Sequence, residues 1–163
     1  MSSVLPEYSF NFVVMIGRDI QMTKSFRSEH HKAMVNIQFT SNWILEKVKT
    51  FVENENITPQ QYNILRILRG SIIPLSTLQI RERMLDKMSD TSRLVDRLVK
   101  KGLAEKKVSA TDKRLVDVTI TAAGIEVLEK LDEKNEQLDS IAQNITEEEA
   151  IAINNLLDKI RHK

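Results

Sequence analysis

The feature that most constrains the fold is a pair of short capped helices joined by a tight turn. Ser76 and Gln79 have the spacing of a capping box, which predicts the start of the first helix. The second helix, within SDTSRLVDRLVKKG, can be capped by Ser89 or Asp90, and Gly102 fits the left-handed position that ends a helix. This order and length are typical of a helix-turn-helix.

The second helix has two faces of opposite character. Its apolar positions recur every three or four residues, as expected of a helix packed on a core, and they are Thr91, Leu94, Val95 and Leu98. The opposite face is polar and cationic, with Ser89, Arg93, Asp96 and Lys100, and with Asp90 and Arg97 beside them. Such a face suits the major groove of DNA.

A hairpin is expected directly after this helix. Residues 103–109 and 115–120 form strand-like runs, and the polar segment between them predicts a turn. A hairpin in this place is a wing, with Lys106 and Lys107 on its first strand and Lys113 and Arg114 at its tip. The tip can straddle a phosphate backbone or insert Arg114 into a minor groove. The alternative is a stabilising hairpin with a solvated tip.

Further capping motifs set the other helix starts. Thr58 with Gln61, and Pro59 at the first helical position, predict a helix that stops at Gly70. Thr121 caps a helix whose apolar spacing continues to residue 145. A capping box of Thr146 and Glu149 predicts a last helix.

The flanking helices carry more apolar surface than one winged helix can cover. Residues 25–54 have helical periodicity with a broad apolar stripe, which includes Met34, Ile37, Phe39, Trp43, Ile44, Leu45, Val48, Phe51 and Val52. We therefore expect the N- and C-terminal helices to pair across a two-fold axis. Residues 1–21 contain an alternating run that predicts a short strand. They can be an arm on a partner subunit or a stretch upstream of a true start at Met22.

Charge is distributed unevenly along the chain. From Arg81 to Arg114 there are eleven Lys/Arg against six Asp/Glu, a net charge of +5, although the whole chain carries only +1. This basic segment suits contact with phosphates. The alternative interpretation is an ordinary charged helix face exposed to solvent. The apolar run near the N-terminus is too short to span a membrane.

Other functional classes find little support in the residues. Without cysteine, disulfides and thiolate metal sites are excluded, and a reducing cytoplasm is compatible. The adjacent His30 and His31 point in different directions on a helix, so they do not form a metal-binding pair. The four glycines stand apart and form no phosphate-binding loop. We expect a cytoplasmic protein that is not an enzyme and has no cofactor or metal.

Four stretches together resemble the MarR family of winged-helix transcription regulators. They are TPQQYNILRIL, PLSTLQIRERM, SDTSRLVDRLVKKGLAEKK and TDKRLVDVTITAAG, and the phrase SRLVDRLVKKGL is the most specific. The resemblance implies a homodimer that binds double-stranded DNA as a repressor or activator. It also implies recognition helices in successive major grooves of a pseudo-palindrome, wings at the flanking minor grooves, and release by a small aromatic ligand.

The resemblance also implies roles for individual residues. Ser89, Asp90, Ser92 and Arg93 would lie at the groove-reading end of the recognition helix, Arg97 near the backbone, Arg114 at the wing tip, and Asp112 orienting that arginine. Two positions depart from the family pattern: Asp90 places an anion near phosphate, and Leu115 follows the wing arginine where many members have a polar residue. The lack of cysteine excludes the thiol sensing of the peroxide-responsive members.

These expectations combine into one architecture: a mainly α fold with a small β-wing. We divide it into an N-terminal extension (1–21), a dimerisation helix (22–57), a winged helix-turn-helix (58–121) and C-terminal dimerisation helices (122–163). A ligand crevice would be lined by Phe39, Trp43, Tyr62 and Leu65, which can equally be ordinary core residues. The expected function is that of a DNA-binding transcription regulator, a repressor. The alternative is a winged helix that only dimerises or docks a protein.

Overall fold

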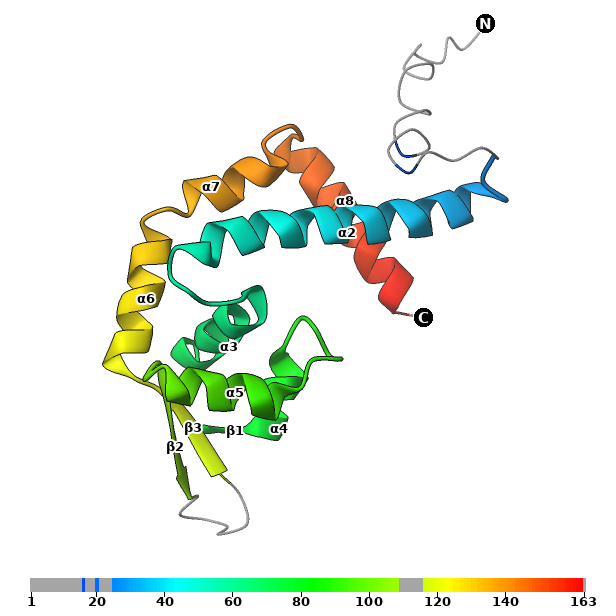
Figure 1. The fold of residues 1–163 in the computed structure, drawn as a ribbon. Helices are drawn as coiled ribbons and strands as arrows, with labels where there is room; N and C mark the ends of the chain where they lie inside the picture. The colour runs from blue at the N-terminus through cyan, green and yellow to red at the C-terminus, as the bar shows by residue number, and fades with distance from the viewer. Residues whose placement is uncertain (1–15, 17–19, 21–24, 109–115, 163) are drawn as a thin grey trace, which may run out of the picture. The chain divides into compact units, whose positions relative to one another are not determined.

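The computed structural model describes residues 16, 20, 25–108 and 116–162 (Figure 1). The chain divides into two compact units, Met1–Ile44 and Leu45–Lys163. The strand expected near the N-terminus lies outside the described residues except at Ile16, whose carbonyl accepts a hydrogen bond from the Ile20 amide at 3.2 Å. The role of residues 1–21 stays a prediction.

Helix α2, Glu29–Glu53, belongs to both units, and its bounds agree with the helix predicted over residues 25–54. From Leu45 onward it lies in the second unit, where Phe51 and Val52 are buried. Further back along the helix the apolar stripe is exposed: Met34, Ile37, Trp43, Ile44 and Leu45 all keep more than a third of their surface accessible. The stripe that sequence periodicity predicted is therefore largely exposed among the described residues.

The second unit contains a winged helix. In chain order its elements are α3 (Pro59–Arg69), β1 (Leu75–Ser76), α4 (Thr77–Arg83), α5 (Thr91–Lys100), β2 (Ala104–Val108) and β3 (Val116–Ile120). The strands form one antiparallel sheet in the order β1-β3-β2. Figure 1 shows the β2–β3 hairpin extending away from these helices. The predicted hairpin strands are confirmed, whereas β1 was missed because it has only two residues and follows Pro74.

Local capping explains why these helices begin where they do. Thr58 and Gln61 form a reciprocal capping box at 3.2 Å, with Pro59 at the first helical position. Ser76 and Gln79 repeat the arrangement at the start of α4. Each box satisfies two backbone groups that a helix N-terminus leaves unpaired, so both helix starts were predictable from sequence.

The core lies beneath α5 and holds this helix in place. Fully buried side chains come from α3, β1, α4, α5, β3 and α6, and they are Ile64, Leu65, Leu75, Ile80, Val95, Leu98, Val118, Leu128 and Leu131. Burial of each such aliphatic side chain contributes roughly 1.5–3 kcal/mol. The apolar face of α5 is thereby fixed, and its other face is left to solvent.

The C-terminal region consists of α6 (Ala122–Asp132), the short α7 (Glu136–Asp139), a 3-10 turn (Ser140–Ala142) and α8 (Glu147–Arg161). The expectation of one continuous helix from Thr121 to Ile145 is wrong. Backbone bonds from Lys134 to Leu131 and from Asn135 to Asp132 tighten the chain after α6, where the residues are polar. The capping box that opens α8 is confirmed.

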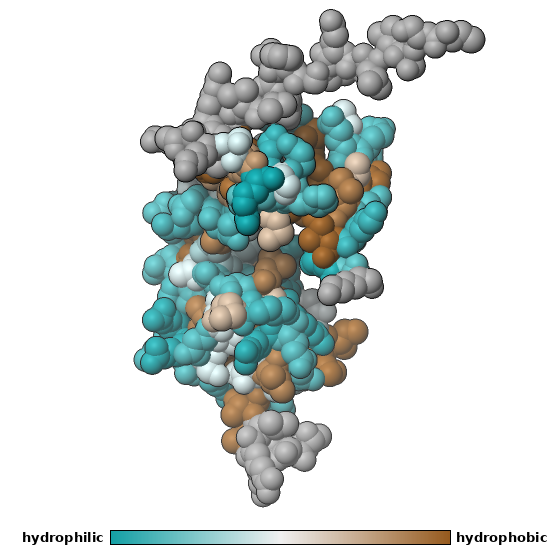
Figure 2. All heavy atoms as spheres, turned by 90° about the vertical axis from the view of Figure 1, so that its right-hand side faces the viewer, coloured by the Kyte–Doolittle hydropathy of each residue, from teal (hydrophilic) through white to brown (hydrophobic). Residues whose placement is uncertain are grey.

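Helix α8 contains no buried residue, although several of its side chains are large and apolar. The most exposed of these are Ile151, Ile153, Leu156 and Ile160. On the face drawn in Figure 2, exposed apolar side chains stand out in a largely hydrophilic surface. Within the described ranges, no helix combines the length and apolarity that a bilayer crossing requires.

Candidate nucleic-acid interface

Both ends of α5, the candidate recognition helix, are fixed by local hydrogen bonds. Asp90 is the N-cap, because its Oδ1 accepts from the Arg93 amide at 3.1 Å. At the other end Gly102 adopts φ 72°, and its amide donates to the Val99 carbonyl at 2.9 Å while the Leu103 amide donates to Leu98. This pair of bonds is a Schellman motif. Of the two candidate caps, the structure selects Asp90.

Ser89 stabilises the turn before the helix. Its hydroxyl donates to Oδ2 of Asp86 at 2.5 Å, and Oδ1 of the same carboxylate accepts from the Met88 amide at 3.0 Å. These hydrogen bonds, led by the one from Ser89, lower the pKa of Asp86. Asn63 of α3 accepts from the Leu85 amide at 3.0 Å. The turn is thus tied to the core helix, and the start of α5 has a defined position.

The two faces of α5 divide as the sequence indicated. Thr91, Val95 and Leu98 are buried and Leu94 is half-buried. The exposed positions include Asp90, Ser92, Arg93, Arg97 and Lys100. Asp90 and Arg93 also form an ion pair at 3.4 Å between Oδ2 and Nε, although both side chains are largely solvated. This exposed face brings together the predicted groove-reading residues of the helix.

The hairpin lysines are engaged with carboxylates of their own chain. Nζ of Lys106 lies 2.5 Å from Oδ1 of Asp96 on α5, and Nζ of Lys107 lies 2.9 Å from Oε1 of Glu105. Glu105 also accepts from the Thr119 hydroxyl at 3.1 Å. The hydrogen bond from Lys106 lowers the pKa of Asp96, and that from Lys107 lowers the pKa of Glu105.

These contacts give Lys106 a second candidate role. Its side chain reaches from β2 to α5, so it joins the hairpin to that helix as well as adding charge to the surface. Lys107 is paired within the hairpin. The three predicted wing-tip residues, Asp112, Lys113 and Arg114, lie outside the described residues, and their roles stay predictions.

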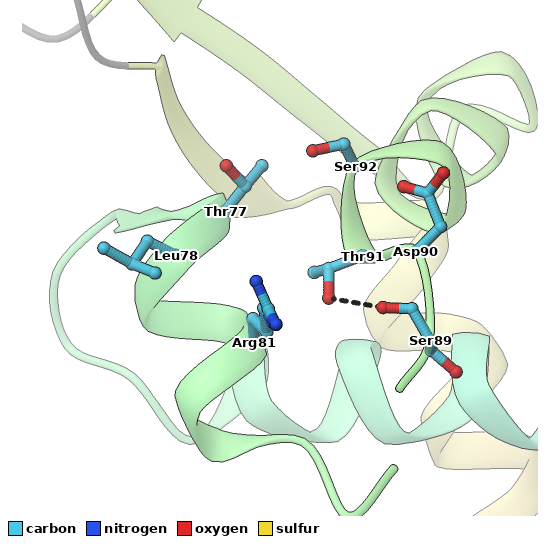
Figure 3. Close-up of a pocket in the computed structure, with 7 residues that line it drawn as sticks. All are labelled: Thr77, Leu78, Arg81, Ser89, Asp90, Thr91 and Ser92. Carbon is cyan, nitrogen blue, oxygen red and sulfur yellow. Dashed lines mark hydrogen bonds between the residues drawn. The ribbon is translucent and has the colours of Figure 1, made fainter. Parts of the chain in front are cut away.

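A further cation stands beside the start of α5 and was missed in the sequence. Arg81 of α4 contributes to an open pocket of about 250 Å³ between α4 and residues 89–92 (Figure 3). Its guanidinium lies between Thr77 on one side and Thr91 and Ser92 on the other. Among the described residues it forms no ion pair. Helical periodicity could have placed it on an exposed face, but the pocket depends on how α4 packs on α5.

The four candidate ligand residues have different environments. Leu65 is fully buried in the core of the second unit, and Tyr62 packs edge-to-face on Phe51 with ring centroids 6.1 Å apart. Phe39 and Trp43 lie on the part of α2 that belongs to the first unit and are partly exposed. The crevice expected between them stays a prediction. No cluster of three His, Asp or Glu side chains suited to a metal occurs within the described part of the chain.

The comparisons agree with this architecture. A family model described as MarR family matches residues 55–115, which contain α3, α4, α5 and β2. This segment of the chain is thus similar to the MarR family. Its fold, mostly helical with a small antiparallel sheet, is the one expected from the sequence. No curated protein matches the chain.

Solved MarR-type structures extend the likeness beyond this segment. A mutant MarR from E. coli in complex with operator DNA is 21% identical with a TM-score of 0.74, over 84% of this chain and 99% of that one. A MarR family transcriptional regulator from Streptomyces coelicolor is 27% identical with a TM-score of 0.71, over 80% and 91%. BpsR from Bordetella bronchiseptica, whose DNA binding is regulated by 6-hydroxynicotinic acid, is 20% identical with a TM-score of 0.70, over 78% and 91%.

Proposed function

We propose that this protein is a transcription regulator that binds specific sequences of double-stranded DNA. The observation that carries the proposal is the exposed face of α5, where Ser92, Arg93 and Arg97 stand on a helix whose other face is locked into the core. The side chains at the start of such a helix can reach base edges, and the cations displace counterions from phosphates. The MarR relative bound to operator DNA supports the same use of the fold.

The proposed active form is a homodimer. In α8, four large apolar side chains are between 44% and 61% exposed, and no residue of that helix is buried. A helix with such a stripe normally covers it against another element. A two-fold axis through this region would present two recognition helices about 34 Å apart, which predicts an inverted repeat with half-sites one turn apart.

Repression with release by a small aromatic molecule is the proposed mode of control. Support comes from BpsR, whose DNA binding responds to an aromatic acid, and from the aromatic and apolar character of Phe39, Trp43, Tyr62 and Leu65. Because a regulator acts where the chromosome lies, the proposed location is the cytoplasm. Thermal shift with a panel of aromatic acids tests the ligand: no shift with any of them would contradict this part.

Measurement of the salt dependence of DNA binding tests the function itself. Wild type should bind labelled duplex DNA with an affinity that falls steeply as salt rises, because each neutralised phosphate releases counterions. Sedimentation equilibrium of the same protein should give a dimer, and Ile153→Glu should shift it toward the monomer. The alternative function, a winged helix that only dimerises or docks a protein, predicts no salt-dependent binding to DNA at all.

A further inference from the structure

The pocket between α4 and the start of α5 has the chemistry of an oxyanion site. Arg81 supplies a guanidinium, and the hydroxyl-bearing side chains of Thr77 and Ser92 lie on opposite walls (Figure 3). The volume, about 250 Å³, accommodates a tetrahedral group with room to spare, and the pocket opens to solvent. A guanidinium with hydroxyls around it matches the acceptors of a phosphate.

The other polar groups of the pocket are already committed elsewhere. The Thr91 hydroxyl is buried, and its one proton has two acceptors within reach, the Ser89 carbonyl at 3.5 Å and Sδ of Met84 at 3.4 Å. The Asp90 carboxylate accepts from the Arg93 amide and pairs with the Arg93 guanidinium. Figure 3 shows that carboxylate directed away from Arg81. The carboxylate of Asp90, which lines the pocket, is therefore not paired with Arg81.

We propose that Arg81, with the hydroxyls of Thr77 and Ser92, binds one phosphate of the DNA backbone and so sets the depth of the recognition helix in the groove. This inference rests on the proposed function. Backbone phosphate is favoured over a free anion because the pocket is open and continuous with the exposed face of α5 through Ser92. A phosphate held there would lie beside the groove that Arg93 reads. Contacts of this kind position a protein without reading sequence.

Binding of labelled random-sequence duplex DNA at several salt concentrations tests the assignment. Arg81→Ala should weaken binding about tenfold, as expected for a lost charged hydrogen bond. It should also reduce the salt slope by about one. Thr77→Val should weaken binding less and leave the slope unchanged, because it removes a hydroxyl and no charge. Arg83→Ala is the matched control: Arg83 is exposed on the same helix but does not line the pocket.

A second arm distinguishes a DNA phosphate from a free one. Inorganic phosphate is titrated into wild type and Arg81→Ala, with thermal melting as the readout and as the check that both variants fold. If wild type binds DNA and Arg81→Ala keeps the full salt slope, the phosphate site is overturned while the proposed function stands. The same conclusion follows if Arg83→Ala weakens DNA binding as much as Arg81→Ala does. If inorganic phosphate raises the melting temperature of wild type but not of Arg81→Ala, and DNA does not bind, the pocket takes a free anion and both proposals fail. No binding of either probe also overturns both.

Discussion

Arg69 and Asp132 join the first helix of the winged helix to the end of α6, with Nη1 of Arg69 lying 2.6 Å from Oδ2 of Asp132. Arg66 reaches the other oxygen of the same carboxylate at 2.8 Å. The hydrogen bond from Arg69 lowers the pKa of Asp132. The contact lies where α6 gives way to the turn before α7, so it fixes the point from which the C-terminal helices leave the winged helix.

Asp132→Asn should therefore destabilise the fold. We expect a loss of about 1 kcal/mol in the free energy of unfolding at neutral pH, since solvent screens a pair that is about one-third exposed. Asp139→Asn, an exposed carboxylate on α7, is the control and should have no measurable effect. Urea denaturation of the two variants and wild type measures the difference. Equal destabilisation by both variants would contradict the account.

The same contact predicts a pH dependence. Because the folded pKa of Asp132 lies below the ordinary value of 3.8, its stabilisation is complete above 3.8 and is lost as the pH falls through the folded pKa. The gap in stability between wild type and Asp132→Asn should thus stay constant at higher pH and close only below 3.8. A gap that narrows well above that value would show that another group is responsible.

We expect Asp90 to stabilise α5 and to weaken the binding of DNA. Asp90→Ala should lower stability by about 1 kcal/mol, because the N-cap bond to the Arg93 amide is lost. Asp90→Asn should keep the cap and the stability while it strengthens binding to random-sequence DNA, because a negative charge near phosphate is removed. Urea melts and DNA titrations separate the two effects. Weaker DNA binding by the stable Asn variant would mean that the carboxylate itself contributes to recognition.

The pair of Lys106 and Asp96 distinguishes a hairpin clamp from a phosphate contact. If Lys106 mainly holds β2 on α5, Asp96→Asn and Lys106→Gln should weaken DNA binding by similar amounts, and the double variant should lose no more than either alone. If Lys106 instead contacts phosphate, Asp96→Asn should strengthen binding. Affinities of the four proteins of this double-mutant cycle give the answer.

Gly124 marks a close approach of α6 to the segment before β2. A Cβ at this position would lie 2.2 Å from the Leu103 carbonyl oxygen and 2.7 Å from Cγ1 of Ile120. Gly124→Ala should therefore destabilise by roughly 1–3 kcal/mol, as overpacking does. Gly70→Ala is the control, because a Cβ there would make only ordinary contacts at 3.4 Å and beyond. Thermal melting that ranks the two variants in the opposite order would be inconsistent with this packing.

Local rules explain which parts of the fold the sequence predicted. The capping boxes at Thr58, Ser76 and Thr146 depend on residues three positions apart, so the helix starts were correct. Strand β1 was missed because it exists only through pairing with β3, where Leu75 lies opposite Val118. Helical periodicity also predicted a helix that continues beyond the end of α6, because apolar spacing alone gives no signal of the turn after Asp132.

The candidate site divides in the same way. The exposed and buried faces of α5 follow from helical periodicity, so their residues were assigned correctly to each side. The position of Arg81 depends on how α4 crosses the start of α5, and the contact of Lys106 with Asp96 depends on how the hairpin lies on the helix. Neither contact has a sequence pattern of its own.

The most direct test of the central claim is selection of random-sequence duplex DNA on the purified protein at two salt concentrations. The account predicts enrichment of an inverted repeat with half-sites about one helical turn apart, bound less tightly at the higher salt. It also predicts that Arg93→Ala relaxes sequence preference by roughly 1–3 kcal/mol at one base pair of each half-site. Recovery of no enriched sequence at either salt concentration would contradict it.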